Sequence, residues 1–412
     1  MRKSSKQKGI TLIALVITII VLIILAGVSI NTLVGQNGII NKAQESGKVT
    51  QVSQEKEMIE LAVLNAKLGE KGYQETSKQA LQEYFDNSLG KDTVTVEDNQ
   101  DTTFLVQFIK SGRNYLVKED GSILSMDEKY RIASVEDLKR FRDEVNSGNT
   151  FEGKYVILEN DITLDKTQQW EPIGSYPNDS PTPDSSQNKP FKGIFDGQGH
   201  KVDGVYINTT EKVKGLFGIV ESGVIKNVGV GENSSITGGV GTAGLVGYTY
   251  KGTLVSNCYN QATVTATGNN SGGIVGVCYL DNKIIKCNNS GVIQGTSCCG
   301  GIIGYNKKNN EIRQCFNTGE VNTKGNWTGG IVGLNLDENI VEQCYNAGKI
   351  KITGDEIGGV VGKNDNAILK DSYNIGKVES TGKYIGGVFG HLQGGMVVNC
   401  YNIRNDYRKP SN

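Results

Sequence analysis

The sequence predicts a mainly β protein built around a parallel β-helix, and three observations support this class. A Gly-apolar-apolar-Gly core recurs at steps of 28 or 29 residues, starting at Gly215, Gly244, Gly273, Gly301, Gly330, Gly359 and Gly387. Self-similarity at such a period is typical of a solenoid. A second phrase keeps the same phase, opening at Cys258, Cys287, Cys315, Cys344, Ser372 and Cys400, with an asparagine two residues after each. Short β-branched runs separated by Gly or Asn fill each unit, which indicates strands rather than helices.

Each repeat fits one coil with three short strands and three bends, for example Gly330–Val332, Ile340–Val341 and Lys349–Ile352. Successive coils would stack at the strand spacing of about 4.8 Å, so that equivalent side chains form columns. Inward Ile, Val and Leu columns would fill the core. We expect the asparagine column at bends with left-handed φ, where its amides can hydrogen-bond from coil to coil. The paired glycines suit a tight corner that a Cβ would obstruct.

These units resemble the GLUG motif, named for its Gly-Leu-any-Gly signature. Gly215-Leu216-Phe217-Gly218 and Gly244-Leu245-Val246-Gly247 carry the resemblance, which covers roughly residues 190–403. Such repeats occur in bacterial surface proteins, including some IgA-directed metallopeptidases. A peptidase of that kind needs His-Glu-x-x-His on a zinc-binding helix. His200 and His391 do not form this pattern, so the resemblance implies the repeat without the catalytic part.

The first thirty residues predict a membrane anchor. Residues 1–9 form a basic leader without acids, and residues 10–30 carry no charge. An apolar run of this length can span a bilayer as a helix. The basic flank predicts a single-pass protein with a cytoplasmic N-terminus and everything after about residue 31 outside. A cleaved secretory signal is the rival interpretation, but its apolar core is usually shorter.

Lys8-Gly9-Ile10-Thr11-Leu12-Ile13 resembles the processing site of type IV prepilins. The resemblance implies that a prepilin peptidase cuts after Gly9 and that Ile10 becomes the methylated N-terminus. Pilins that polymerise usually carry Glu at the fifth mature position, where it pairs with a neighbour's terminal ammonium. Ala14 occupies that position here, and a buried unpaired ammonium is unfavourable. Assembly with other pilin-like subunits therefore stays open, as does a minor subunit, a tip protein or a static anchor.

Residues 31–70 are expected to form a helical stem. In its most helical part, residues 51–67, the apolar face would comprise Val52, Met58, Ile59, Leu61, Ala62 and Leu64. Residues 71–128 predict a small α/β unit, similar in topology to pilin heads. It would hold a helix at Ser77–Phe85 and strands at Thr93–Val96, Phe104–Ile109, Asn114–Lys118 and Ser122–Leu124, with a hairpin turn at Asp120-Gly121.

Residues 129–403 form the predicted repeat domain. Its first element is a short helix, Ser134–Val145, capped by Ser134. An open solenoid end exposes strand edges, so this helix would serve as the N-terminal cap. The Pro-rich stretch 174–190 is expected to be a loop excursion. Eight or nine coils would give a rod of roughly 40 Å, followed by a polar tail at residues 404–412.

The net charge of −1 favours neither nucleic acid nor anionic membrane surfaces, and no nucleic-acid partner is expected. All eight cysteines lie in the repeats, and five occupy the repeat's own column, where they fit as small buried hydrophobes. Cys278, Cys287, Cys298 and Cys299 lie in consecutive coils and are the best placed to oxidise or bind metal. Because Cys-x-x-Cys pairs are missing, neither a metal site nor a cofactor is predicted.

Two sets of residues bear on function. Glycosidases and lyases on β-helices need clustered acids on one outer face, and the candidates lie in the early coils: Asp161, Asp165, Asp196, His200 and Asp203. We interpret them as turn-forming and solvated groups and assign no catalytic residue. Aromatic residues predicted to point outward form a column that can either stack on sugar rings or pack along a coil corner: Tyr259, Phe316, Tyr345, Tyr373 and Tyr401.

The sequence therefore predicts a non-enzymatic, membrane-anchored, pilin-like surface protein that displays a β-helix. Its role would be adhesion, binding of a glycan or protein ligand, or structure, and it could enter a surface filament. Two alternatives stay open: a cell-surface carbohydrate-active enzyme on a β-helix, and a minor pseudopilin of a secretion or DNA-uptake machine.

Overall fold

The computed structural model describes most of the chain after the predicted membrane segment. The described residues are 39–67, 76–98, 103–118, 123–125, 129–178 and 182–403. Gly9, Ile10, Ala14 and the rest of the leader and predicted span lie outside them, as does the tail at 404–412. Among the helices that are described, none is long and apolar enough to cross a membrane. The chain divides into two compact units, which are considered separately.

The N-terminal unit contains two helices and one four-stranded sheet. The helices are α2 (Ile39–Lys67) and α3 (Lys78–Leu89), and the strands follow in spatial order β1 (Val94–Asp98), β2 (Thr103–Phe108), β3 (Arg113–Lys118) and β4 (Ile123–Ser125). Strands β1 and β2 pair antiparallel. Ser77 caps α3, because its hydroxyl accepts a hydrogen bond from the Ala80 N–H. The predicted helix and four strands are present, whereas the hairpin turn lies outside the described residues.

The buried face of α2 differs from the prediction. Ile59, Ala62 and Ala66 are buried, following the spacing of one helical face, but Leu61 and Leu64 are 46% and 53% exposed. Helix α2 packs against α3 through this narrower face. The prediction therefore included Leu61 and Leu64, which lie on the exposed side of the helix, and omitted Val63 and Ala66, which are buried.

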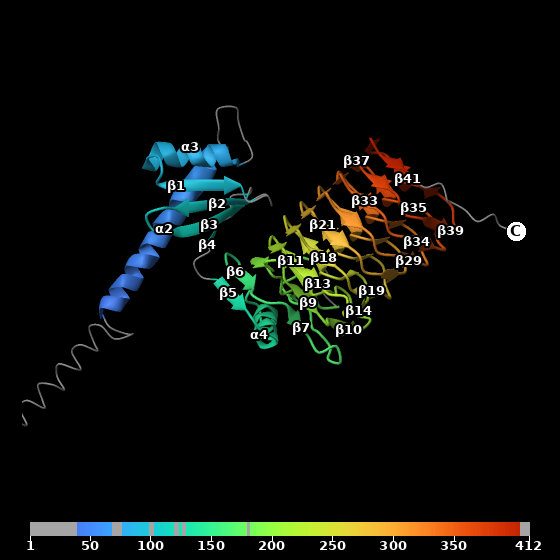
Figure 1. Ribbon diagram of the computed structural model, residues 1–412, viewed down its shortest axis with the longest axis horizontal. Helices are drawn as coiled ribbons and strands as arrows, with labels where there is room; N and C mark the ends of the chain where they lie inside the picture. The colour runs from blue at the N-terminus through green and yellow to red at the C-terminus, as the bar shows by residue number, and fades with distance from the viewer. Residues whose placement is uncertain are drawn as a thin grey trace, which may run out of the picture. The chain divides into compact units, whose positions relative to one another are not determined.

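The second unit is a parallel β-solenoid, which confirms the central prediction. One coil contributes a short strand to each of five parallel sheets. Figure 1 shows the stacked coils, coloured from green to red. Sheet I comprises β11 (Phe217–Glu221), β16 (Val246–Tyr250), β21 (Val275–Tyr279), β26 (Ile303–Lys307), β31 (Val332–Leu336), β36 (Val361–Asp365) and β41 (Phe389–Gln393). Sheet II comprises β5 (Lys129–Ile132), β6 (Tyr155–Leu158), β8 (Ile194–Asp196), β12 (Val224–Lys226), β17 (Leu254–Ser256), β22 (Lys283–Ile285), β27 (Glu311–Arg313), β32 (Ile340–Glu342), β37 (Ile368–Lys370) and β42 (Met396–Val398).

The other three sheets consist of shorter strands. Sheet III comprises β7 (Ile162–Thr163), β9 (Lys201–Asp203), β13 (Gly229–Val230), β18 (Tyr259–Asn260), β23 (Asn288–Asn289), β28 (Phe316–Asn317), β33 (Tyr345–Asn346), β38 (Tyr373–Asn374) and β43 (Tyr401–Asn402). Sheet IV comprises β10 (Tyr206–Asn208), β14 (Ser235–Gly238), β19 (Thr263–Ala266), β24 (Ile293–Gly295), β29 (Val321–Thr323), β34 (Ile350–Ile352) and β39 (Val378–Ser380). Sheet V comprises β15 (Thr242–Ala243), β20 (Ser271–Gly272), β25 (Cys299–Gly300), β30 (Thr328–Gly329), β35 (Ile357–Gly358) and β40 (Ile385–Gly386).

Two details of the predicted coil are wrong. The coil has five strands rather than three, and Gly330 and Ile331 form a bend instead of a strand, with β31 starting at Val332. The left-handed residue is Gln343, three positions before Asn346, with a φ of 54°. The same position is left-handed in the other coils, at Asn257, Lys286, Gln314, Asp371 and Asn399. This bend separates sheets II and III, so the asparagine column itself lies in extended strands.

The asparagines form a continuous ladder through the solenoid, as predicted. The Asn317 Nδ2 donates to the Asn346 Oδ1 at 2.8 Å and also to the Gly319 carbonyl oxygen at 2.9 Å. Both amides are fully buried. The same contacts recur from Asn260 to Asn374, and Asn374 donates to Asn402 at 2.7 Å. A second ladder, which the sequence analysis missed, joins Asn306, Asn335 and Asn364 at 2.7 Å.

The first repeat glycine is required by the asparagine ladder. A Cβ on Gly330 would lie 2.2 Å from the Asn346 Cγ and 2.3 Å from the Gly359 carbonyl oxygen, and real Cβ atoms do not approach so closely. Gly301 faces Asn317 in the same way at 2.3 Å. The two sequence columns that revealed the repeat therefore touch each other in the fold, since glycine allows the backbone to approach the amide.

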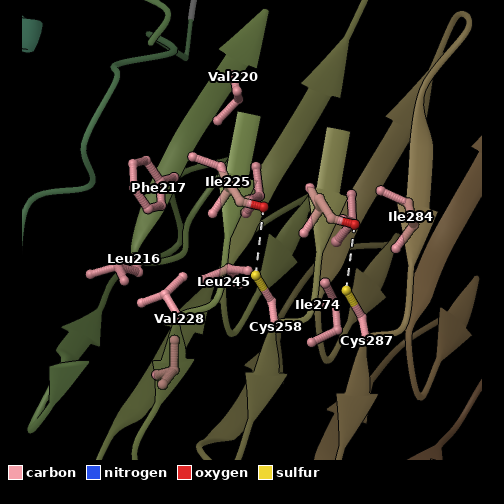
Figure 2. Packing of buried hydrophobic residues seen from close by; sticks show 14 of the residues in the cluster. Leu216, Phe217, Val220, Ile225, Val228, Leu245, Cys258, Ile274, Ile284 and Cys287 are labelled. Carbon is pink, nitrogen blue, oxygen red and sulfur yellow. Dashed lines mark hydrogen bonds between the residues drawn. The ribbon is translucent and has the colours of Figure 1, made fainter. Parts of the chain in front are cut away.

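The core is a set of apolar columns that includes the repeat cysteines. Ile331, Val332 and Val341 are fully buried in it, as are their counterparts in the neighbouring coils. Figure 2 shows Cys258 and Cys287 among these side chains, each thiol pointing at a carbonyl oxygen of the preceding coil. All eight cysteines are free thiols. This agrees with their interpretation as small buried hydrophobes.

The two ends of the solenoid differ in how far they are covered by other parts of the unit. Helix α4 (Val135–Asn146) lies across the first coils, as predicted, and buries Leu138, Phe141 and Val145. Ser134 caps this helix, and the Asp137 carboxylate accepts hydrogen bonds in return from the Ser134 hydroxyl and the Ala133 N–H. The last coil has a different environment: the residues of its strands β41, β42 and β43 are half-buried or exposed.

Candidate functional site

The predicted aromatic column is present, but its rings stack on one another. Phe316, Tyr345, Tyr373 and Tyr401 occupy one outward position of sheet III in consecutive coils. Their ring centroids are 5.0 to 5.2 Å apart with interplanar angles of 4° to 6°. Tyr259 is separated from this stack by Asn288. Because both faces of Tyr345 and Tyr373 are covered by neighbouring rings, these residues cannot stack on a sugar without breaking the column.

The candidate acids of the early coils differ in burial and in their hydrogen-bond partners. Asp196 is buried and accepts hydrogen bonds from the Tyr155 hydroxyl at 2.6 Å and from Asn227 at 3.0 Å. Asp203 is buried as well and binds the side chain and backbone of Asn233. Asp165 accepts from Thr167 on the surface. These three acids stabilise turns and coil contacts.

One pair among those acids faces solvent. The Asp161 Oδ1 lies 3.0 Å from the His200 Nδ1 and also accepts from the Lys201 N–H. The hydrogen bond with His200, followed by that with Lys201, lowers the pKa of Asp161. Over the described ranges, no three His, Cys, Asp or Glu residues converge in a way that could hold a metal ion. Cys278, Cys287, Cys298 and Cys299 were predicted to be the best placed to oxidise or bind metal. All four are buried free thiols. Burial raises the pKa of each, to about 12 for Cys278 and Cys298 and to about 11 for Cys299.

A second outward row, which the sequence analysis missed, runs along sheet I. From the second repeat core onward, the residue after the second glycine of the core occupies it: Tyr248, Val277, Tyr305, Leu334, Lys363 and His391. Val277 and Leu334 are only 6% and 8% exposed, whereas Tyr305 is half-buried. Burial raises the pKa of Tyr305.

A column of left-handed residues borders this row; from Gly241 onward its members lie immediately before the strands of sheet V. It comprises Val213, Gly241, Asn270, Cys298, Trp327, Glu356 and Tyr384, all with positive φ. Contacts tie the two columns together: Gly241 lies next to Val277, and the backbone of Trp327 lies next to Gly362, which precedes Lys363. His391 lies against Glu356 at 2.6 Å and stacks on Tyr384. We call these two columns together the outer strip.

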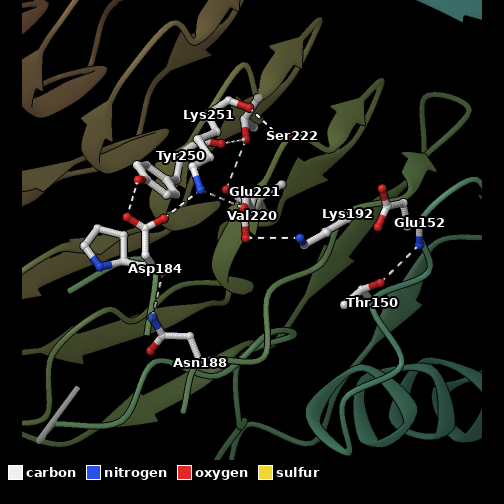
Figure 3. A network of polar contacts seen from close by, with 12 residues as sticks. Thr150, Glu152, Asp184, Asn188, Lys192, Val220, Glu221, Ser222, Tyr250 and Lys251 are labelled. Carbon is white, nitrogen blue, oxygen red and sulfur yellow. Dashed lines mark hydrogen bonds and ion pairs between the residues drawn. The ribbon is translucent and has the colours of Figure 1, made fainter. Parts of the chain in front are cut away.

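The Pro-rich excursion covers the first coils of the outer strip. Its Tyr176 ring stacks on Tyr248 at 5.7 Å, and the Lys212 Nζ lies 5.0 Å from the Tyr176 ring centroid. Figure 3 shows how Asp184 fastens the excursion: its carboxylate accepts from the Tyr250 hydroxyl at 2.8 Å and from the Lys251 Nζ at 2.6 Å. The hydrogen bond from Lys251, followed by that from Tyr250, lowers the pKa of Asp184. The excursion therefore places the Tyr176 ring on Tyr248 of the outer strip, and the hydrogen bonds of Asp184 with Tyr250 and Lys251 hold the excursion in place.

The sequence did hold a signal for the outer strip. Its first column directly follows each repeat core, and from Gly241 onward its second column lies three residues before each core. The residue types vary between aromatic, aliphatic and charged, so no simple periodic composition marks the strip. Recognising it required knowing that these positions, seven residues apart in each coil, lie side by side.

Comparison with known proteins gives limited relationships. No family model matches the chain. Halomucin from Haloquadratum walsbyi is 30% identical over 189 residues, which cover 42% of this chain and 2% of the length of that protein. A solved structure named "putative immunoglobulin A1 protease" from Bacteroides ovatus has a TM-score of 0.48 and 20% identity, covering 66% of this chain and 84% of its own. The GLUG and prepilin assignments therefore stay predictions.

Proposed function

We propose that the chain is a pilin-like cell-surface protein that presents its β-solenoid outside the membrane for adhesion. Residues 10–30 would anchor it, with the N-terminus cytoplasmic. The observation that carries the adhesive role is the solenoid surface, where outward side chains repeat in register over consecutive coils. Repeat proteins use such extended surfaces for binding. The order α2, α3 and a four-stranded sheet supports the pilin-like part, because pilin heads have a similar topology.

The anchor is tested by the mass of the N-terminal peptide from cell-associated protein. We expect a peptide that begins with methylated Ile10, and a Gly9→Leu variant that keeps its leader. A start at Met1 would remove the prepilin peptidase from the proposal and leave a plain anchor. A start beyond Ile30 would contradict membrane anchoring and favour a secreted protein.

The adhesive role is tested by comparing cells that display the full chain with cells that display a chain lacking residues 129–403. We expect binding to a substratum coated with glycans or surface proteins only for the full chain, with equal amounts of both chains at the surface. Equal attachment of the two cell types would overturn the adhesive role.

A carbohydrate-active enzyme is the second candidate, and the Asp161–His200 pair favours it. An exposed carboxylate and an imidazole 3.0 Å apart can exchange a proton with a bound substrate. The measurement is release of reducing ends from polysaccharides by the wild type and by Asp161→Asn. Activity that the substitution abolishes would replace adhesion by hydrolysis or elimination, and activity in neither protein would remove this candidate.

A further inference from the structure

The outer strip contains aromatic residues whose rings are not stacked on other rings. In the stack from Phe316 to Tyr401, neighbouring rings lie face to face. Tyr305 has Val277 and Leu334 as its neighbours along the strip, and neither Tyr305 nor Trp327 has an aromatic partner in the described part of the chain. Among the described residues, no other aromatic ring therefore covers Tyr305 or Trp327, in contrast to the rings of the stack.

The backbone at this position is unfavourable for the side chains it carries. The turn before sheet V has a left-handed residue in each coil, and glycine would fill it with the least strain, as Gly241 does. Val213, Trp327 and Tyr384 have φ values of 57°, 62° and 54°, a conformation that costs bulky or β-branched residues about 1 kcal/mol or more each. The Trp327 Nε1 is closed off from solvent without a hydrogen-bond partner among the described residues. Strained backbone and unpaired polar groups are concentrated at functional sites.

The protein itself shows what kind of group fits the strip. In the first coils, the flat ring of Tyr176 lies on Tyr248, and the Asp184 carboxylate accepts hydrogen bonds from Tyr250 and Lys251. Two and three coils further on, Tyr305 and Trp327 stand in the same two columns, beyond the excursion. A ligand on these coils would repeat that pattern, with a flat apolar face on the aromatic residues and polar groups at the edges.

The charges along this part of the strip are balanced. The Lys307 Nζ lies 3.6 Å from Asp337, and the Lys363 Nζ lies 3.7 Å from Asp365. His391 contacts Glu356. These groups provide hydrogen-bond donors and acceptors in similar number, without a net charge that would select an acidic or basic polymer. A neutral, hydroxyl-rich ligand with flat apolar faces fits this description.

We propose that the outer strip between Tyr305 and His391 binds a neutral, unbranched glycan chain that runs along the solenoid axis. Aromatic side chains would cover the C–H faces of successive sugar rings, and the flanking charged pairs would bind their hydroxyls. The inference rests on the proposed adhesive function and names its ligand class and its site.

Fluorescence provides a direct test, because the chain has two tryptophans and Trp170 is only 5% exposed. A Trp170→Phe variant of the full chain would leave Trp327 as the reporter. We would titrate it with cellohexaose, chitohexaose, mannohexaose and laminarihexaose, and with oligogalacturonate and a proline-rich peptide. At least one neutral oligosaccharide should change the emission in a saturable way, whereas the acidic oligosaccharide and the peptide should not.

The site is located by matched substitutions followed by calorimetric titration. Tyr305→Ala and Trp327→Ala should weaken binding about tenfold or more, which corresponds to about 1.4 kcal/mol. Tyr345→Ala is the control, because Tyr345 is also a half-buried outward tyrosine, in the stacked column; it should leave the affinity unchanged. Thermal unfolding would verify that each variant is folded.

Three results would overturn the glycan site: no binding of any neutral oligosaccharide, equal loss in Tyr345→Ala, or preference for the acidic oligosaccharide or the peptide. The adhesion assay separates these failures from failure of the proposed function. If cells displaying Trp327→Ala adhere as well as the wild type, the solenoid is adhesive through another surface. If cells displaying the wild type do not adhere, the proposed function itself fails.

Discussion

The first and last coils of the solenoid have the same backbone plan but opposite environments. At the first coils, the Phe141 ring of α4 packs on Phe151 and Phe191 at 4.9 and 5.6 Å, and all three residues are buried. At the last coil, Met396 and Tyr401 are 55% and 52% exposed. A stacked coil is stabilised by its two neighbours, so a coil with one neighbour has about half of that support. The difference shows that position along the stack, as well as residue type, determines what a side chain contributes.

The largest expected effect comes from placing a charge in the core column. Ile331→Asp would bury an unpaired carboxylate in the middle of the solenoid, because Ile331 is fully buried. We expect a loss of more than about 4 kcal/mol in unfolding free energy. Val388→Asp is the matched variant, since Val388 occupies the same column in the last coil and is half-buried. It should lose much less in urea unfolding followed by circular dichroism. Equal losses would mean that the last coil is covered in solution.

Removing the aromatic ring of the cap should have the next largest effect. Phe141→Ala deletes a buried ring that contacts four others, and we expect a loss of about 3 to 4 kcal/mol. Lys139→Ala, on the exposed side of α4, should change stability by less than about 0.5 kcal/mol. Thermal and urea unfolding of both variants provide the comparison. A small effect of Phe141→Ala would show that α4 is not needed to cover the first coils.

Breaking the asparagine ladder should have a smaller effect that depends on the coil. Asn317→Ala would leave the buried Asn289 amide without its Oδ1 acceptor, and we expect a loss of about 1 to 3 kcal/mol. Asn402→Ala affects a ladder member at the partly exposed end and should cost less than about 1 kcal/mol. Unfolding midpoints in urea would measure both. If the end substitution were the more damaging, the asparagines would not act as a ladder stabilised from both sides.

The reactivity of the cysteines toward an alkylating reagent should distinguish the last coil from the interior coils, with no change in the stability of the protein at neutral pH. Cys400 is half-buried, whereas the other seven thiols are buried. Burial raises the pKa of Cys278 to about 12, and alkylation requires the thiolate. Native protein treated with iodoacetamide at pH 8 should therefore gain one adduct, at Cys400, detected by peptide mass. Rapid alkylation of Cys278 or Cys344 would mean that the interior coils open.

The same pKa shift predicts how stability changes in alkaline solution. The Cys278 thiol has a pKa near 9 when unfolded and about 12 when folded, so only the unfolded chain ionises in between. The stabilising contribution is complete below pH 9 and decreases as the pH rises from 9 to 12. A Cys278→Ala variant should show a shallower decline in urea midpoint over this range than the wild type.

The fold was predictable from the sequence wherever equivalent residues recur at the same position of successive coils. The repeat spacing, the parallel solenoid, the inward position of Ile331 and the amide ladder through Asn346 follow from residues that recur at 28 or 29 positions. The helix capped by Ser134 was predictable because the capping residue and three apolar residues at helical spacing lie close together in the sequence. Bends were less predictable: Gln343, rather than Asn346, adopts the left-handed conformation, and the residues at its position in other coils vary among Asn, Asp, Gln and Lys.

The candidate site was less predictable than the fold. Tyr345 and Tyr373 point outward as expected, but only their distances and angles show that their ring faces are covered. Trp327 and Leu334 belong to the same strip although Trp327 lies in the turn before sheet V and Leu334 lies on sheet I, and no local pattern connects them. Asp184 is 66 residues from Tyr250 in sequence, yet it binds that residue and Lys251.

The sequence by itself determined the period, the stacking of coils and the identity of the core columns. These properties repeat along one dimension, and a stacked coil places each residue above its counterpart. The tertiary structure alone decided how many strands each coil has, which aromatic faces are covered and where the excursion lies. These features depend on the angles of the bends and on contacts between different columns, and neither is written in the spacing of residues along the chain.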